Sequence, residues 1–217
     1  IEHWAILDAL KEDRIDYRYA RILSHIYRNA KASVKLHETT ENFKIERGVR
    51  QGDPISPKLF NATLESVFRK LNWTNFGLTI NGERLNHLRF ADDIVLITDD
   101  LKEMDSMLQQ LNKEAEDIGL KINIGKTKMM TNLVISENLK LNGEQIDQVW
   151  SYKYLGHDIA ISRDNQTLEV QKRINMAWAA FGKLRYVFKD KLPICLKRKV
   201  FDQCVLPVFT YGAETLT

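Results

Sequence analysis

The spacing of hydrophobic residues predicts four amphipathic helices in the first part of the chain. In each of them, apolar side chains recur every three or four residues, which is the period of one helix face. Pro54 and Pro57 suit the first turn of the third helix, and Gly119 is placed to end the fourth in the left-handed conformation. The helices are predicted over residues 4–12, 16–29, 53–71 and 101–118.

Between the helices, alternating apolar and polar positions predict short strands joined by tight turns. Asn81-Gly82 and Asn142-Gly143 are the strongest turn signals, because Asn-Gly favours a two-residue hairpin. A further turn is predicted at Asp92-Asp93, inside the segment RFADDIVLIT. Apart from the Asn142-Gly143 hairpin, the predicted strands and hairpins cover residues 33–48, 78–85, 87–98, 120–123, 127–134 and 152–159.

From Thr167 onward the pattern is helical only. One apolar stripe runs from Val170 to Phe188, and Pro193 is placed to begin a second helix. The sequence therefore predicts an α+β body up to about residue 160, followed by a small helical unit.

The composition is that of an ordinary globular protein, with 44% hydrophobic and 28% charged residues among 217. No apolar stretch approaches the length that spans a bilayer, so we expect no membrane partner. Two cysteines are too few for a disulfide framework and favour an intracellular setting. Residues 165–217 carry nine Lys and Arg against four Asp and Glu, a mild indication of a polyanionic partner.

The adjacent acids Asp92 and Asp93 stand between apolar, strand-forming residues. An acid pair at a hairpin turn is most often simply solvated. Like charges in a partly buried hairpin repel each other unless a cation neutralises them. Because the flanking strands are strongly apolar, we expect the pair at the end of a buried sheet. Two carboxylates there, with a third nearby, would hold divalent ions for phosphoryl transfer, and Mg²⁺ prefers such ligands.

A second candidate segment, ERGVRQGDPISPKLFN at residues 46–61, joins a predicted strand to a helix. Gly48 and Gly52 allow sharp turns, or close approach of a ligand to the backbone. Gln51 offers both a donor and an acceptor for a base edge or a sugar, and the free N–H groups at the helix start suit phosphate. The alternative is a plain structural turn before a proline-started helix.

Four motifs occur in order along the chain: GVRQGDPISPKLFN, FADD, GLKINIGKTKMM and YKYLGHDI. Together they resemble the palm of reverse transcriptases, most closely those of non-LTR (LINE-type) retrotransposons, and LPVFTYGAETLT resembles the thumb of that group. The resemblance implies a polymerase-type palm over residues 1–160, with an antiparallel sheet flanked by helices, and a partial helical thumb over residues 161–217. Group II intron maturases are a related alternative.

The resemblance also implies roles for individual residues. Asp92 and Asp93 would be the catalytic, metal-binding carboxylates, and Lys126 a general acid near the triphosphate. The template base and nucleotide would lie against Arg50, Gln51, Gly52, Pro54, Ser56, Phe90 and Ala91. The hairpin that grips the primer end would consist of Tyr154, Leu155, Gly156 and His157. On the following helix, the candidates for contact with the nucleic-acid backbone are Lys172, Arg173, Lys183 and Arg185.

Each role has a plainer alternative. Lys126 can be an ordinary surface lysine, since most lysines are exposed. Tyr154 and Leu155 can belong to a strand packed on the core, and His157 can be a solvated histidine. The aromatic stripe that includes Trp178 is expected in the core of the helical unit rather than as a platform for bases.

The implied activity is RNA-directed DNA synthesis by two-metal nucleotidyl transfer, with Mg²⁺, or Mn²⁺ in its place, as cofactor. The implied partners are an RNA template, a DNA primer and deoxynucleotide triphosphates, in a retroelement ribonucleoprotein of nucleus and cytoplasm. The family carries its first catalytic aspartate just before a helix like IEHWAIL, and the chain begins at Ile1, so we expect this polypeptide to be inactive alone. A non-catalytic nucleic-acid-binding remnant and a structural domain with coincidental motifs are the alternatives.

Overall fold

The computed structural model describes residues 1–35, 37, 39–133, 139–161 and 165–215. The chain forms two compact units by its contacts. Unit 1 comprises Ile1–Thr127 and Leu139–Ile146, and unit 2 comprises Lys128–Asn138 and Asp147–Thr217. This division differs from the predicted boundary near residue 160, because the hairpin at 151–160 groups with the C-terminal helices.

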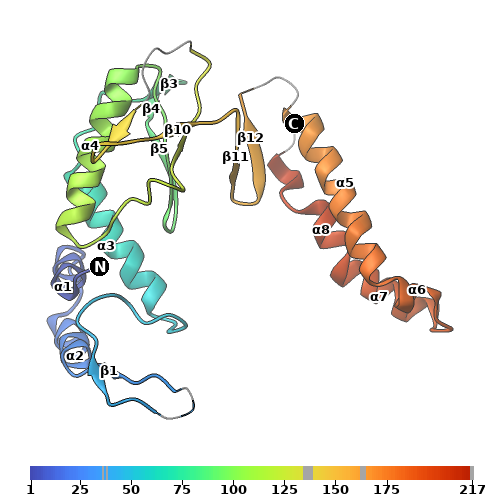
Figure 1. Cartoon of the computed structure of the whole chain (residues 1–217), viewed down its shortest axis with the longest axis horizontal. Helices are drawn as coiled ribbons and strands as arrows, with labels where there is room; N and C mark the ends of the chain where they lie inside the picture. Colours follow the sequence, from blue (N-terminus) through green and yellow to red (C-terminus); the bar gives the residue numbers. More distant parts are fainter. Residues whose placement is uncertain (36, 38, 134–138, 162–164, 216–217) are drawn as a thin grey trace. The chain divides into compact units, whose positions relative to one another are not determined.

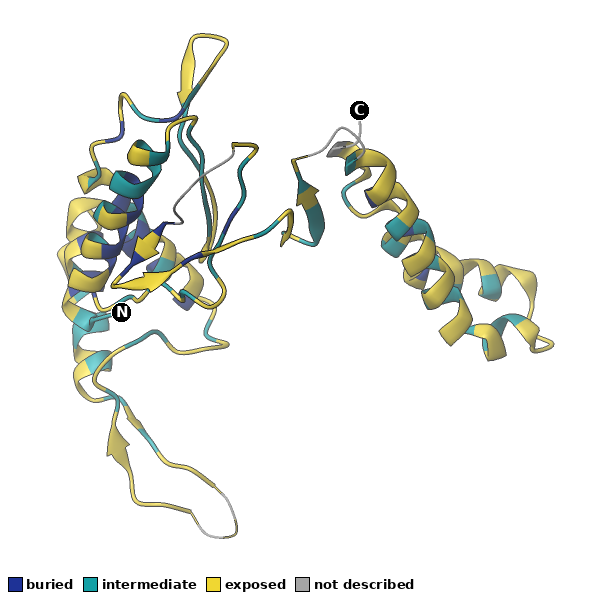
Figure 2. Cartoon of the chain, turned by 45° about the horizontal axis from the view of Figure 1, so that its top comes forward, coloured by how far each residue is buried: buried dark blue, intermediate teal, exposed yellow. Residues whose placement is uncertain are grey.

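The core of unit 1 lies between helices α1, α3 and α4 (Figures 1 and 2). Its buried side chains include Val67 and Phe68 of α3 and Met107 of α4, at the helical spacing that the sequence shows. Asp100 caps α4 by accepting hydrogen bonds from two backbone amides of its first turn. The helices of unit 1 are α1 (His3–Glu12), α2 (Tyr17–Arg28), α3 (Ser56–Lys70) and α4 (Leu101–Asp117).

The strands of unit 1 pair only with a neighbour in sequence, as antiparallel two-stranded ribbons among the described residues. Asn81-Gly82 and Asn142-Gly143 form their turns as predicted, with both residues of each pair at positive φ. The ribbons are β1 (Lys31–Ala32) with β2 (Phe43–Lys44), β3 (Leu78–Ile80) with β4 (Glu83–Leu85), β5 (His87–Phe90) with β6 (Asp93–Leu96), and β8 (Lys140–Leu141) with β9 (Glu144–Gln145).

Unit 2 consists of two short ribbons followed by helices (Figure 1). Parallel strands β7 (Lys128–Met129) and β10 (Asp147–Gln148) form one ribbon. The antiparallel strands β11 (Ser151–Tyr154) and β12 (His157–Ala160) form the other, which packs against α5. The helices are α5 (Asn165–Lys183), α6 (Arg185–Lys189), α7 (Ile194–Cys204), α8 (Leu206–Thr210) and the 3-10 helix η1 (Ala213–Thr215).

Several predicted elements differ from the structure. Residues 120–123 form no strand; Leu120 and Ile122 instead pack as coil against the core of unit 1. The strand predicted over 127–134 is reduced to β7 among the described residues, and residue 134 lies outside them. The predicted antiparallel sheet flanked by helices appears in the described parts only as separate ribbons. The fold is therefore mixed helix and strand, while the names palm and thumb stay predictions.

The helical segment also departs from the predicted single stripe. α5 ends at Lys183 and α6 begins at Arg185, so the stripe from Val170 to Phe188 is divided between two helices. Phe181 and Phe188 stack at 4.5 Å, but Trp178 is largely exposed rather than part of a core.

Candidate active site

The β5–β6 hairpin is anchored to α3 through one of its two faces. The ring of His87 lies 4.8 Å from that of Phe68, and the Arg89 guanidinium lies 4.0 Å above the same ring. Arg89 also forms an ion pair with Glu65 at 2.9 Å. Ile94 and Leu96 of β6 complete this face against the core of unit 1. Because alternate residues of a strand share a face, the neighbouring residues point the other way.

The order of these contacts gives the direction of the hairpin. His87 contacts Phe68 and Trp73, near the end of α3, whereas Arg89 reaches back to Glu65. β5 therefore runs toward the N-terminus of α3, the end that the segment at 46–55 precedes. The hairpin tip therefore points toward the end of α3 that is preceded by the bend at Gly48–Gly52 (Figure 1).

The tip carries the two predicted catalytic acids on an open surface. Phe90 and Asp93 pair across the strands, so Ala91 and Asp92 form a two-residue turn. All four residues are exposed, with 64% of Phe90 accessible. The prediction that the acids end a buried sheet was wrong, because this hairpin has no further strand beside it among the described residues and its outer face is open.

Ala91 has an unusual backbone conformation for this turn. Its φ is 54°, in the left-handed region that costs residues with a Cβ roughly 1–2 kcal/mol. The first turn residue of three other hairpins has a similar φ, but two of these residues are Asn, which tolerates this region, and only Leu155 resembles Ala91. Backbone strain of this kind concentrates at functional sites, so it supports a role for the acid-bearing turn.

The carboxylate oxygens at the hairpin tip are of the kind that binds a divalent cation. Among the described residues, no hydrogen bond or ion pair engages the carboxylate of Asp92 or Asp93. Exposed carboxylate oxygens without partners are the ligands that Mg²⁺ prefers. The described part of the chain contains no group of three or more His, Cys, Asp or Glu side chains that could hold a metal ion. The tip therefore supplies two carboxylates and no third.

The bend before α3 is held by the N-terminal residues of unit 1. The amide of Gly48 donates to the carbonyl of Ile1 at 2.7 Å, and Nε2 of His3 donates to the carbonyl of Gly48 at 3.1 Å. Arg47 forms an ion pair with Glu2 at 3.6 Å. These contacts fix the position of Gly48, the first glycine of the bend, and so constrain the path of the backbone that follows it.

The residues predicted to bind substrate differ in how far they are exposed. Arg50, Gln51, Gly52 and Pro54 are exposed. Ser56 is only 5% exposed, so its hydroxyl is not on the surface that presents Gln51, contrary to the prediction. Pro54 precedes α3 rather than lying in its first turn. Lys126 is exposed in a turn of unit 1, where its amide donates to Asn123.

The predicted primer-end hairpin, β11–β12, turns at Leu155 and Gly156, whose φ values are 49° and 84°. The hydroxyl of Tyr211 donates to the carbonyl of Leu155 at 2.8 Å. Arg173 donates through Nη2 to the carbonyl of Gly156 at 2.6 Å. Tyr154 is half-buried, and Leu155 is exposed at the turn.

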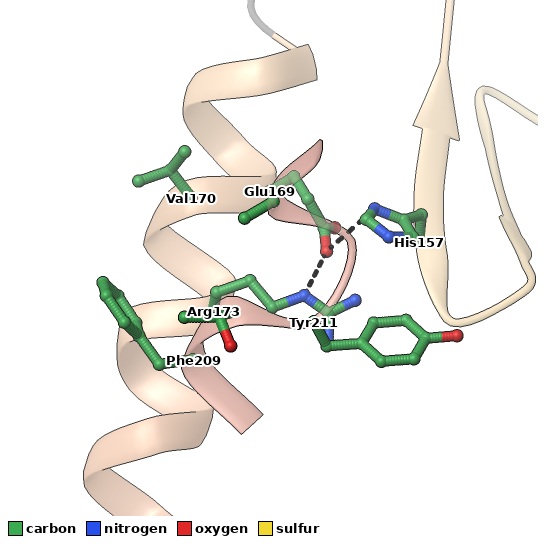
Figure 3. Close-up of a pocket in the computed structure, with 8 residues that line it drawn as sticks. His157, Glu169, Val170, Arg173, Phe209 and Tyr211 are labelled. Carbon is green, nitrogen blue, oxygen red and sulfur yellow. Dashed lines mark hydrogen bonds and ion pairs between the residues drawn. The ribbon is translucent and has the colours of Figure 1, made fainter. Parts of the chain in front are cut away.

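The cations predicted to contact nucleic acid differ in their surroundings. Arg173 is 6% exposed and pairs with Glu169 at 2.6 Å (Figure 3), so it does not offer a surface charge, and the prediction was wrong on this residue. Lys172 is half-buried and pairs with Asp158. Lys183 and Arg185 are exposed. Only these last two carry a fully exposed charge, and their contact with nucleic acid stays a prediction.

Glu169 is the centre of this cluster. Burial alone would raise the pKa of its carboxyl, but the amide of Asp158 and the cations of Arg173 and Lys172 outweigh burial and lower the pKa. His157, suggested as a solvated histidine, is instead half-buried, 3.4 Å from Glu169 and stacked on Tyr211 at 5.7 Å. Sequence reasoning missed Glu169 and Tyr211, although the Glu169–Arg173 spacing of four is the usual signal of a helical ion pair.

Comparison with known proteins identifies the class. Residues 2–159 match the family model described as "Reverse transcriptase (RNA-dependent DNA polymerase)". The chain therefore belongs to the reverse transcriptase family, and its relatives place it among the enzymes of non-LTR retrotransposons. The resemblance seen in the motifs is thereby confirmed.

Among the relatives, an uncharacterized transposon-derived protein of Caenorhabditis elegans is 37% identical over 145 residues, covering 64% of this chain and 52% of that protein. A retrovirus-related Pol polyprotein from the type-1 retrotransposable element R2 of Nasonia vitripennis is 29% identical over 225 residues, covering 97% of this chain and 21% of the polyprotein. The chain thus spans about half of the first relative and about a fifth of the second. Within the described residues, no helix is long and apolar enough to cross a membrane.

Proposed function

We propose that this chain supplies the catalytic turn, the nucleotide-side bend and the primer-end hairpin of an RNA-directed DNA polymerase. The observation that carries the proposal is the exposed pair Asp92 and Asp93, on a hairpin that runs along α3 toward the bend at Gly48–Gly52. Family membership supports an RNA template, a DNA primer and deoxynucleotide triphosphates as substrates.

In the proposed reaction the 3′-hydroxyl of the primer attacks the α-phosphate of a deoxynucleotide, and pyrophosphate leaves. Asp92 and Asp93 would hold Mg²⁺, or Mn²⁺ in its place, and a bound ion supplies neutralisation of phosphate charge. The exposed amide of Gln51 is proposed to bind the base or sugar, and Phe90 to lie against the primer strand. Lys126 is proposed to give a proton to the leaving pyrophosphate.

We further propose that the 217-residue polypeptide binds nucleic acid but does not polymerise by itself. The support is the donor count: in the described residues, two carboxylates at the tip have no third ligating side chain beside them. A two-metal site needs more anionic oxygens than that to bind two ions well. Primer extension with Mg²⁺ or Mn²⁺ should yield no product, and robust synthesis would refute this part of the proposal.

Metal binding at the tip can be tested without activity. We expect weak binding of Mn²⁺, followed by electron paramagnetic resonance, that is lost in the double variant Asp92→Asn and Asp93→Asn. Asp99→Asn is the matched control, since Asp99 also belongs to an adjacent acid pair but its neighbour Asp100 caps α4. If the control abolishes Mn²⁺ binding as fully as the double variant, the ions do not bind at the tip.

Nucleic-acid binding should depend on salt because it relies on exposed cations. Each phosphate contact contributes about 0.9 to the slope of log K against log salt concentration, so replacing Lys183 and Arg185 by Ala should lower that slope by about two. The matched control replaces Lys102 and Lys113, two exposed lysines of α4. An equal loss of slope in the control would contradict the placement of the contact on α5 and α6.

A further inference from the structure

The turn of the β11–β12 hairpin is held through both of its carbonyl groups. Tyr211 donates to Leu155 and Arg173 donates to Gly156, so two side chains distant in sequence fix two successive peptide groups. An isolated two-stranded hairpin is marginally stable at best. Because no further strand joins β11 or β12 among the described residues, contacts of this kind decide where the turn lies.

A single buried carboxylate connects the helix to the hairpin. Glu169, 4% exposed on α5, accepts from Nε of Arg173 at 2.6 Å (Figure 3). It also accepts from the amide of Asp158 at 3.3 Å. The guanidinium of Arg173 also lies 4.8 Å above the ring of Tyr211. Arg173 therefore contacts the turn, Glu169 and Tyr211 at once, and its planar fork of donors suits that geometry in a way an ammonium group does not.

The backbone of the turn fits closely against the segment after α8. A Cβ on Gly156 would lie 3.2 Å from the ring of Tyr211, and a Cβ on Gly212 would overlap the ring of His157. Both glycines have positive φ, at 84° and 70°. Any other residue at Gly156 or Gly212 would therefore be strained by the positive φ, and its Cβ would crowd the neighbouring ring.

We propose that Glu169, Arg173 and Tyr211 are positioning residues that fix the Leu155-Gly156 turn relative to α5 and the segment after α8, and so determine where the primer 3′ end lies. This rests on the proposed function, in which that turn contacts the primer. None of the three is a ligand of the catalytic ions or a surface cation. Their loss should therefore misplace the primer end more than it weakens binding.

The contribution of these hydrogen bonds to the stability of the turn is tested first by amide hydrogen exchange of residues 151–160 in the full chain. Tyr211→Phe removes the hydroxyl and keeps the ring beneath Arg173. Exchange in the hairpin should become about fivefold faster, which corresponds to the loss of one ordinary hydrogen bond. Tyr186→Phe, the same change at an exposed tyrosine of α6, is the matched control and should leave the exchange unchanged.

The effect on the primer is tested with an RNA–DNA primer–template that carries 2-aminopurine either at the primer 3′ end or in the middle of the duplex. At saturating protein, Tyr211→Phe and Arg173→Lys should change the fluorescence of the end probe and leave the middle probe unchanged. The dissociation constant should stay within about twofold, since neither variant removes an exposed cation that could contact phosphate.

The outcomes separate this inference from the proposed function. If the wild-type chain binds no primer–template, the proposed function fails and the positioning role fails with it. If it binds, but the end probe and the hairpin exchange are unchanged in Tyr211→Phe, the positioning role alone is overturned. Equal changes of both probes would show a general structural effect and would also overturn it. Should Arg173→Lys not fold, Tyr211→Phe decides by itself.

Discussion

Two hairpins that carry predicted functional residues, one in each unit, have the same form and opposite surroundings. Each has four residues per strand and a two-residue turn, in β5–β6 and in β11–β12. In the first hairpin the strands are anchored and the turn is open, because Arg89 contacts α3 while Asp92 is exposed. In the second the turn itself is held, because Arg173 and Tyr211 take up its carbonyl groups.

The difference suggests how one chain can both present ligands and support a bound strand. A turn that has to bind ions must leave its oxygens without internal partners, whereas a turn that supports a strand gains rigidity when its polar groups are satisfied within the protein. The left-handed positions do not follow this division, because the first turn residue is a non-glycine at positive φ in both hairpins, Ala91 at 54° and Leu155 at 49°.

The largest expected effect comes from breaking the buried pair at the held turn. Arg173→Met leaves the carboxylate of Glu169 buried without its main cation, and such a change costs about 3 kcal/mol of unfolding free energy. Urea denaturation followed by circular dichroism measures the loss. Lys183→Met, at the exposed end of the same helix, should change stability by less than about 0.5 kcal/mol.

A double variant sharpens this result. With Glu169→Met added to Arg173→Met, neither charge of this buried pair remains, and an apolar pair of similar volume is often tolerated. The double variant should therefore be more stable than Arg173→Met alone. If it is less stable, the uncompensated charge is not what makes Arg173 necessary.

The next effect tests the backbone of the two turns. Gly156→Ala should cost about 2 kcal/mol, since a left-handed φ is unfavourable for Ala and the added Cβ would crowd Tyr211. Ala91→Gly should change stability by less than about 0.5 kcal/mol, because relief of strain is offset by the greater freedom of glycine in the unfolded chain. Urea denaturation measures the unfolding free energy of both variants. A comparable loss of unfolding free energy in both would contradict the expected difference between the two turns.

The sequence predicted the hairpins better than it predicted their anchors. Alternation and turn residues located the FADD turn to within one residue, since the turn is Ala91-Asp92 and Asp93 already begins β6. The helix signals around Asp100 and Gly119 located α4. Periodicity identifies a face but not its partner, so nothing in the pattern linked Arg89 to Phe68 and Glu65. The strand expected at 120–123 shows the same limit, because its alternating residues have no partner strand and pack as coil.

The error at Arg173 has a different cause. Basic residues of a helix are usually exposed, and this assumption placed Arg173 with Lys183 and Arg185 as contacts for phosphate. Glu169, one turn earlier, was the available sign of an internal pair. What the sequence could not supply was Tyr211, because that contact depends on how the segment after α8 returns to α5.

A third prediction uses pH to separate the two hairpins. Burial and the nearby Arg89 lower the pKa of His87 below 6.5, so its contribution to the stability of unit 1 is complete above that pH and is lost as pH falls through the lowered pKa. Glu169 has its pKa lowered from 4.5, so its contribution to unit 2 is complete above pH 4.5 and is lost only at more acidic pH. Hydrogen exchange across the acid range should show β5–β6 opening first. His87→Gln should remove that early step and leave the later one unchanged.

The smallest expected effect is at the open turn itself. Replacing Asp92 and Asp93 by Asn removes two exposed carboxylates that have no partner in the described part of the chain, so stability should rise or fall by less than about 0.5 kcal/mol. Adding Mn²⁺ should raise the melting temperature of the wild type slightly and that of the variant not at all, since an ion that binds only the folded state stabilises it. Differential scanning calorimetry measures both. A large loss of stability in the variant would mean that the acids hold the turn together, and the contrast between an open and a held hairpin would then be wrong.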